Sequence, residues 1–154
     1  HSVIFQPEKR LMWVSTSPWQ CGKYVAYDLN KIFKDTIDWQ HEIYSSDLTI
    51  PEDKFIDTPE FQHLLTYKKL TPLLLKKIRK KEQIEESVLK TYQASNPSLY
   101  YVYEVIGDYY EGMQQPQQAI AYWQQALKKS IPKLQEKERI QQKIQKQSKD
   151  GKES

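Results

Sequence analysis

The sequence has little cysteine and little glycine, with one cysteine (Cys21) and 4 glycines in 154 residues. A single cysteine excludes an intrachain disulfide framework and a zinc site built from several cysteines. The few glycines form no phosphate-binding loop. No apolar run approaches the length of a membrane-spanning helix. We therefore expect no metal, no cofactor and no membrane span.

A strong excess of one charge sign is also missing. The chain has 23 Lys and Arg against 20 Asp and Glu, a net charge of +3, whereas nucleic-acid-binding domains usually carry a larger basic excess on one face. The most basic segment, residues 76–81, is followed at once by glutamates. The pairs Lys81–Glu85 and Glu86–Lys90 have the spacing of neighbours on a helix. A solvent-exposed helix face, on which neighbouring glutamates neutralise the basic residues, explains this run. We therefore expect no nucleic-acid partner.

The N-terminal segment has the composition of β-structure. Residues 3–5 and 11–14 are β-branched, aromatic or large apolar, and Pro7 lies between the two runs, so the pattern predicts a β-hairpin. Neither run alternates, which is typical of strands covered on both faces. An isolated hairpin is marginal in water, so we expect it to belong to a sheet that the rest of this chain can hardly supply. The alternative is packing on the chain's own helices.

Residues 17–57 are predicted to be mostly irregular, with short strands at 23–29 and 42–50 and a helical turn at 30–33. From Thr58 onward the apolar spacing becomes helical, and Thr58-Pro59 is typical of a helix start. Thr71-Pro72 predicts either a new helix or a kink. Helices are expected at 58–93, 97–111, 116–129 and 132–147, with 149–154 as a disordered tail.

One spaced motif lies within the helical half. Small residues alternate there with large aromatic ones, as two closely packed antiparallel helices require. The pattern resembles the tetratricopeptide repeat, a helical hairpin of about 34 residues. Its motif residues are Tyr103, Ile106, Gly107, Tyr110, Ala119, Trp123, Ala126 and Pro132.

Only one repeat fits the motif. A shift of 34 residues toward the N-terminus places Leu73 where Gly107 stands and Glu85 where Ala119 stands. Because a lone repeat cannot bury its faces, we expect residues 58–93 to act as a divergent preceding repeat and 132–147 as a polar capping helix. The tyrosines of this region are interpreted as core and rim packing, with a peptide-binding groove as the alternative.

The first 33 residues suggest a different relationship. Residues 1–5, 11–14, the turn at 18–23 and the segment 27–29 resemble the closing strands of acyl-coenzyme A:6-aminopenicillanic acid acyltransferase-like proteins. These bacterial linear amide C–N hydrolases belong to the N-terminal-nucleophile class. The resemblance implies strands inside an αββα sandwich, which would explain a hairpin that is apolar on both faces.

Catalytic residues of that class cannot be carried over. Such enzymes use a chain-terminal Cys, Ser or Thr whose own α-amino group helps to activate it, whereas this chain begins with His1. Ser2 and Cys21 are internal. We expect the chain to be a piece of a longer protein whose nucleophile lies upstream, and no residue is predicted to be catalytic.

Other combinations of reactive residues give only weak support for a catalytic or metal site. Cys21 could pair with His41 or His63, but a free cysteine is more often a small packed hydrophobe. The dipeptide at 41–42 lacks the two-histidine helical spacing of a metalloprotease. The remaining acidic candidates are interpreted as ordinary loop residues: Asp35, Asp38 and Asp47.

The predicted fold is mainly α, with antiparallel tetratricopeptide-like hairpins after a short β-hairpin segment. The expected parts are a sandwich remnant at 1–57, a helical domain at 58–148 and the tail. The expected function is that of a non-catalytic C-terminal piece of an amide-bond hydrolase or acyltransferase. Its partner would be the catalytic domain of the same parent protein or a second copy of the chain. The alternative is a stand-alone interaction module that binds a peptide or protein.

Overall fold

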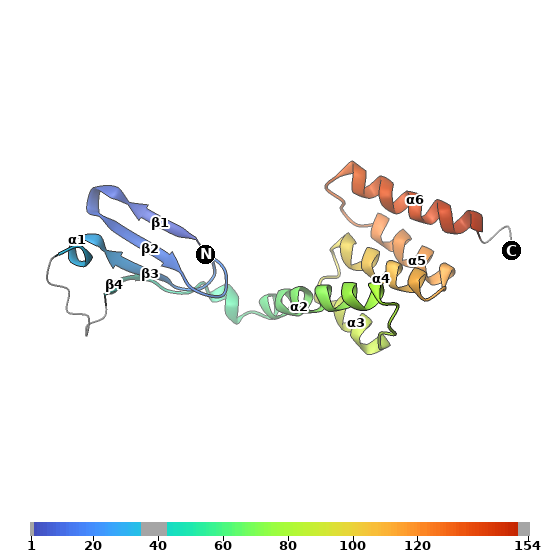
Figure 1. Cartoon of the computed structure of the whole chain (residues 1–154), viewed down its shortest axis with the longest axis horizontal. Coiled ribbons are helices and arrows are strands. Elements are labelled where there is room, and N and C mark those ends of the chain that lie inside the picture. Colours follow the sequence, from blue (N-terminus) through green and yellow to red (C-terminus); the bar gives the residue numbers. More distant parts are fainter. Residues whose placement is uncertain (1, 35–42, 151–154) are drawn as a thin grey trace. The chain divides into compact units, whose positions relative to one another are not determined.

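The computed structural model describes residues 2–34 and 43–150. The chain divides into two compact units, residues 1–62 and 63–154. The first unit holds a four-stranded antiparallel sheet, and the second consists of helices (Figure 1). The prediction of a mainly helical chain with β-structure near the N-terminus is confirmed.

Four strands form the sheet in the order β1-β2-β3-β4, each antiparallel to the next. β1 and β2 are the predicted hairpin, and the 3-10 helix η1 between them ends at Arg10 with a φ of 54°. The expectation that the chain could hardly supply a larger sheet is wrong, because two further strands follow. The bounds are β1 Val3–Gln6, η1 Pro7–Lys9, β2 Leu11–Ser15, β3 Tyr24–Asp28 and β4 Ser45–Ile50.

Short helices and an aromatic cluster complete this unit. α1 (Leu29–Ile32) begins directly after β3, and the 3-10 helix η2 (Lys54–Asp57) follows β4. The Phe61 ring packs edge-to-face against Trp19 and Phe55, with ring centroids 6.1 and 5.6 Å apart. Phe61 is only 3% exposed, so this cluster is a local core for the end of the sheet.

Both faces of the sheet are partly exposed at β1, where Ile4 on one face is 45% and Val3 on the other 46% exposed, but only one face has buried members. Strand alternation and register place Ile4, Trp13 and Ala26 on one face. There Ala26 is fully buried, and the Trp13 indole nitrogen donates a 2.8 Å hydrogen bond to the Leu48 carbonyl. The opposite face, called the apolar sheet face below, has no buried member. It consists of Val3, Phe5, Met12, Val14, Val25 and Tyr27.

The second unit is a succession of helices packed in chain order, since α3 contacts α4, α4 contacts α5, and α5 contacts α6. α4 is the central helix, with eight buried residues. In the described part of the chain, no helix combines the length and the apolar character needed to cross a bilayer. The first four residues of α2 belong to the first unit and the rest to the second. The bounds of the helices are α2 Pro59–Arg79, α3 Glu86–Ser95, α4 Tyr100–Gly112, α5 Pro116–Leu127 and α6 Leu134–Asp150.

Pro72 does not divide the first of these helices. It lies inside α2, so the alternative of a new helix beginning at Thr71-Pro72 is wrong. The preceding Thr71 turns its hydroxyl back to donate to the Tyr67 carbonyl at 2.7 Å. Proline removes one helical hydrogen bond, but the helix remains continuous on both sides of it.

Two other boundaries also differ from the prediction. Lys81 adopts a φ of 54° in the turn after α2, so the predicted helical pair Lys81–Glu85 is wrong, whereas Glu86 and Lys90 form their pair at 2.8 Å. α6 continues to Asp150, so the first residues of the predicted disordered tail are helical. Residues 151–154 lie outside the described residues.

α4 and α5 form an antiparallel hairpin with a very close contact at Gly107. A Cβ atom on this glycine would lie 2.5 Å from Cδ1 and Nε1 of Trp123. Trp123, on α5, is fully buried, as are Ala119 and Ala126 on the same helix. The missing side chain of Gly107 therefore makes room for the indole, and the two alanines allow α5 to approach.

Replacing Gly107 with alanine should destabilise the helical unit by about 1–3 kcal/mol, because the new methyl group overlaps the Trp123 ring. Chemical denaturation monitored by circular dichroism measures the change. Gly112→Ala is the matched control, since a Cβ there meets nothing within 4 Å, and it should be neutral or slightly stabilising. Equal stability of the two variants would contradict the close-contact assignment.

Candidate functional site

The motif residues lie in the core of the α4–α5 hairpin and on its border. Six are buried: Tyr103, Ile106, Gly107, Ala119, Trp123 and Ala126. Tyr110 is half-buried and stacks on Tyr122, with ring centroids 5.4 Å apart. Pro132 is exposed and precedes α6. Because most of these side chains are inaccessible, they act as packing residues.

The largest cluster of charged groups instead joins α4 to α6. Four polar side chains follow one stripe of α4, spaced by four, four and three residues, and four others follow a stripe of α6. They pair across the two helices, and we call this arrangement the α4–α6 seam. It contains Tyr100, Glu104, Asp108 and Glu111 on α4, and Glu136, Arg139, Lys143 and Gln147 on α6.

Glu104 is the most deeply buried charged residue of the seam, at 2% exposure. Arg139 donates to it from two nitrogens, Nε to Oε1 at 3.0 Å and a terminal nitrogen to Oε2 at 2.8 Å. Lys143 adds a third bond to Oε1 at 2.9 Å. Two-pronged arginine pairing with extra donors is the arrangement that compensates a buried carboxylate best.

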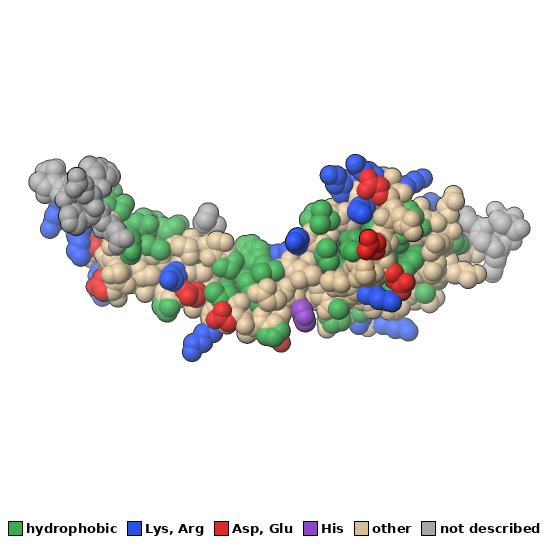
Figure 2. All heavy atoms as spheres, turned by 90° about the horizontal axis from the view of Figure 1, so that it is seen from below, with side chains coloured by type: hydrophobic (Ala, Val, Ile, Leu, Met, Phe, Trp, Pro, Cys, Tyr) green, Lys and Arg blue, Asp and Glu red, His purple; other side chains and the backbone are tan. Residues whose placement is uncertain are grey.

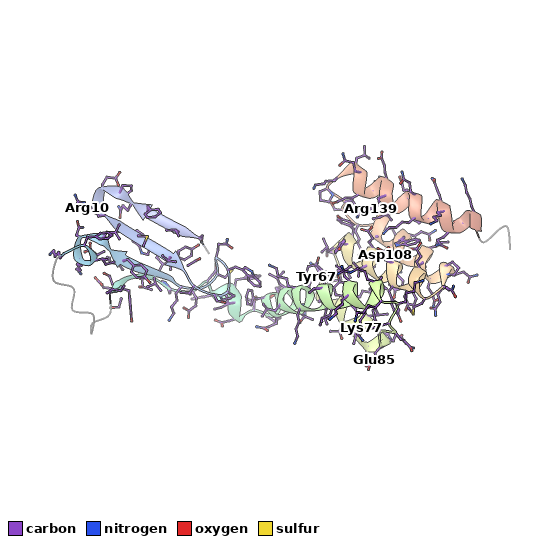
Figure 3. All side chains as sticks on the ribbon, viewed as in Figure 1. Arg10, Tyr67, Lys77, Glu85, Asp108 and Arg139 are labelled. Atoms are coloured by element: carbon purple, nitrogen blue, oxygen red, sulfur yellow. The ribbon has the colours of Figure 1, made fainter. Side chains whose placement is uncertain are left out.

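Asp108 extends the seam to a third helix. Lys143 donates to its two oxygens at 2.7 and 2.8 Å, and the Trp123 indole nitrogen on α5 donates to Oδ1 at 2.9 Å. Figure 3 labels Asp108 and Arg139 on the helices that the seam connects. Two carboxylates and two cations make the centre of the seam electrically neutral.

Burial and hydrogen bonding shift several pKa values in the seam. Burial raises the pKa of Asp108, although Lys143 and Trp123 oppose the shift. Burial alone would lower the pKa of Lys143, but its bonds to Asp108 and Glu104 outweigh this effect and raise it. The pKa of Tyr100 rises to about 12, through burial and then through its 2.5 Å hydrogen bond to Glu136.

The geometry suits the seam to holding helices together. Its carboxylates are engaged by cations or hydrogen-bond donors, and among the described residues no buried side-chain polar atom lacks a partner. The same part of the chain holds no group of three His, Cys, Asp or Glu residues arranged to bind a metal. Sequence reasoning missed the seam, although the three acids of α4, spaced by four and three residues on one side of the helix, were a usable signal.

The other candidate residues are not brought into one site. Cys21 is half-buried in the turn after β2, where its carbonyl accepts a 2.8 Å bond from the Asp53 amide. His63 belongs to the other unit, and Asp47 is exposed on β4. The remaining candidates, Asp35, Asp38, His41 and Glu42, lie outside the described residues.

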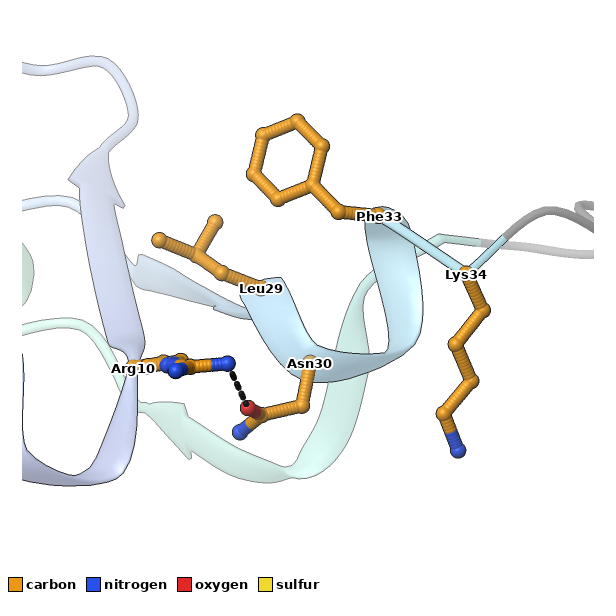
Figure 4. A pocket seen from close by; sticks show the side chains of 5 residues that line it. All are labelled: Arg10, Leu29, Asn30, Phe33 and Lys34. Carbon is orange, nitrogen blue, oxygen red and sulfur yellow. Dashed lines mark hydrogen bonds between the residues drawn. The ribbon is translucent and has the colours of Figure 1, made fainter.

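A hollow of about 580 Å³ lies at the hairpin-turn end of the sheet (Figure 4). Arg10 donates a 3.4 Å bond to the Asn30 side chain there, and Phe33 is 80% exposed beside it. Leu29 and Lys34 complete the lining. None of these five side chains is buried, so the hollow is an open surface feature with two cations.

Comparison of this chain with protein families, with curated proteins and with solved structures finds no match.

Removing the Lys143 ammonium should weaken the seam selectively. We expect Lys143→Met to lower the free energy of unfolding by about 1–3 kcal/mol, because Glu104 loses one donor and Asp108 its cation. Lys146→Met, on an exposed position of the same helix, should change stability little. Chemical denaturation compares the free energies of unfolding of the two variants, and hydrogen exchange compares the protection of their α6 amides. Equal protection of α6 in both variants would argue against the seam.

Tyr100 should make stability depend on alkaline pH. Its folded-state pKa of about 12 exceeds the ordinary tyrosine value of 10.0, so its contribution to stability is complete below pH 10 and is lost as the pH rises toward 12. The Tyr100→Phe variant should lose less stability across this interval than the unmodified chain. Other tyrosines titrate in both proteins, so the difference between the two denaturation series isolates Tyr100. Parallel pH profiles would contradict the assignment.

Proposed function

We propose that this chain is a non-catalytic packing module of a larger amide-bond hydrolase or acyltransferase. In this proposal the sheet unit provides one layer of a β-sandwich. The helical unit is a tetratricopeptide-like extension that supports the assembly or mediates self-association. The partner is the catalytic domain of the same parent protein or a second copy of the chain.

The apolar sheet face is the observation that carries the proposal. Its six side chains come from three adjacent strands, and Phe5 and Val3 are 61% and 46% exposed. Figure 2 shows hydrophobic side chains gathered in patches on this unit. Each large apolar side chain left in water forgoes roughly 1.5–3 kcal/mol of transfer free energy, so a covering layer would be strongly favoured.

The chemistry of the face favours another β-layer as its cover. Three of its six members are valines, whose short β-branched side chains can pack against a flat layer, and none of the six is charged. The valines are Val3, Val14 and Val25. Stacked sheets interdigitate such side chains across about 10 Å. This agrees with the sandwich that the resemblance of the first 33 residues implies, in which such strands are internal.

The helical unit supports an interaction role by a separate argument. The tight Gly107–Trp123 contact and the small residues Ala119 and Ala126 are the features by which repeat hairpins pack closely. A stand-alone peptide-binding module is the second candidate, and the match to the tetratricopeptide motif favours it. The uncovered sheet face distinguishes the two, because a stand-alone module has no need of it.

The proposal predicts that the isolated chain self-associates through the apolar sheet face when no catalytic layer is present. Phe5→Lys should then lower the apparent mass measured by light scattering at high protein concentration, because the ammonium group cannot be buried there. Phe33→Lys is the matched control, since Phe33 is also exposed but lies outside the face. It should leave the apparent mass unchanged.

The same measurement can refute the proposal. If the unmodified chain and Phe5→Lys are both monomeric at all concentrations and unfold at the same denaturant concentration, the face needs no cover. Circular dichroism spectra must first establish that each variant is folded.

A further inference from the structure

β1 is the outermost strand of the sheet, and one of its edges is open. Among the described strands it pairs with β2 alone, and Figure 1 shows it at the margin of its unit. The Ser15 amide donates to the Ser2 carbonyl at 2.9 Å, so these two residues form a hydrogen-bonded pair. Because such pairs alternate along antiparallel strands, Ile4 also bonds to β2, whereas the backbone groups of Val3 and Phe5 point to the open edge. Within the described part of the chain, these two amides and two carbonyls have no partner.

The open edge of β1 lacks the features that protect sheet edges from further pairing. Protected edges carry charged side chains, prolines or bulges. The opposite edge of this sheet is of that kind, because β4 contains Asp47, is followed by Pro51 and pairs with β3 through a register shift. β1 has the sequence Val-Ile-Phe-Gln, with no charge and no proline, and its register with β2 is regular. It is therefore the edge that can accept another strand.

The backbone groups on this edge are complementary to a second copy of themselves. When two β1 strands run antiparallel with Ile4 opposite Ile4, Val3 of each copy lies opposite Phe5 of the other. In this register Val3 and Phe5 form hydrogen-bonded pairs that satisfy all their outward-pointing amides and carbonyls. A shift by one residue in either direction pairs Val3 or Phe5 with a position outside β1, and on one side that position is Pro7, which has no amide to donate. Hydrogen bonding therefore favours the register centred on Ile4.

The side chains also match in this register. Val3 and Phe5, 46% and 61% exposed, would lie side by side on the apolar sheet face, as an aromatic and β-branched pair of the kind that stabilises antiparallel strands. On the other face the 45% exposed Ile4 would meet Ile4 of the second copy, and the polar Ser2 would meet the polar Gln6. Apolar groups therefore meet apolar groups and polar groups meet polar groups, and the apolar sheet face continues from one copy into the other.

We propose that two copies of this chain pair through the open edge of β1, antiparallel and centred on Ile4, to form one continuous sheet. This inference rests on the part of the proposed function in which a second copy is the partner, and it adds an edge contact to association through the apolar sheet face. The same strand is used on both sides, so the contact is isologous and closes at a dimer. β1 has only four residues, so the dimer should form reversibly with concentration.

Substitutions at one position separate the edge contact from the face contact. Val25→Lys, on β3 and away from the edge, is the background, because it places a charge on the apolar sheet face and removes association through that face. This background should be a dimer in sedimentation velocity at high concentration. Adding Val3→Pro deletes an outward amide and keeps the bonds to β2, as proline allows on an edge strand, so the chain should become monomeric. Adding Val3→Ala keeps the amide and should keep the dimer.

Cross-linking tests the register itself. In a Cys21→Ser chain, Ile4→Cys places a thiol at the two-fold axis, where the facing Cβ atoms of the two copies would lie about 4.5–5.5 Å apart. Oxidised glutathione should then link the copies by a disulfide. Gln6→Cys is the matched control on the same face of β1. It lies two residues from the axis in each copy, so the facing positions are roughly 13 Å apart by the rise of a strand, and it should not link.

The outcomes separate this inference from the sheet-face proposal, once circular dichroism has established that each variant is folded. If the Val25→Lys background is monomeric while the unmodified chain associates, the edge contact is refuted, the edge is left to a strand of another protein, and the sheet-face proposal survives. If Val25→Lys associates as strongly as the unmodified chain and Val3→Pro makes it monomeric, the edge contact holds and the sheet-face proposal fails. Equal association of Val3→Pro and Val3→Ala, or equal cross-linking of the two cysteine variants, overturns the edge contact. Should Val3→Pro not fold, the cross-linking comparison decides alone.

Discussion

The close approach of α4 and α5 at Gly107 is the contact on which the helical unit depends. Because Gly107 has no side chain, the Trp123 indole lies directly against α4. That position brings the indole nitrogen within 2.9 Å of Asp108, and Asp108 in turn binds Lys143 of α6. The absence of a side chain at Gly107 thus allows the positions of the Trp123 ring, the Asp108 carboxylate and α6. A wider separation of α4 and α5 would disrupt all three.

The seam shows how polar groups can be placed next to such a core. Buried ion pairs contribute little net stability, since desolvation offsets attraction, but removing one partner is costly. Glu104 therefore fixes where α6 can lie more than it strengthens the unit. With Arg139 and Lys143 both bound to it, a shift of α6 by one turn would leave a buried carboxylate without its cations.

Both units have exposed apolar surface, but the shape of that surface differs between them. The sheet unit presents a continuous face of six side chains, suited to another layer of structure. The helical unit presents a small groove lined by α2, α3 and the turn between them, and two exposed leucines, Leu73 and Leu134. The described polar clusters, in contrast, satisfy one another internally. The exposed apolar surface, and not the polar clusters, is therefore the feature of each unit that remains available for binding.

The local elements could be predicted because their causes are local. Val, Ile and aromatic runs around Pro7 specified the hairpin, and Pro116 with the apolar spacing after it specified α5. The small residues at 107, 119 and 126 indicated close helix packing before any contact was known. Pro72 does not begin a new helix, because the loss of a single backbone hydrogen bond is too small to end a helix of this length.

The sequence by itself determined where most of the strands and helices lie, apart from the turn after α2 and the end of α6, and which helix faces are apolar. Periodicity and turn residues act over a few positions, so they can be recognised locally. Only the tertiary structure decided that β3 and β4 complete the sheet, which sheet face is uncovered and that Glu104 meets Arg139. Those outcomes depend on pairing between segments up to 35 residues apart. The packing of the whole unit decides which strand pairs with a given strand edge and which cation binds a buried carboxylate. A local sequence pattern does not contain this information.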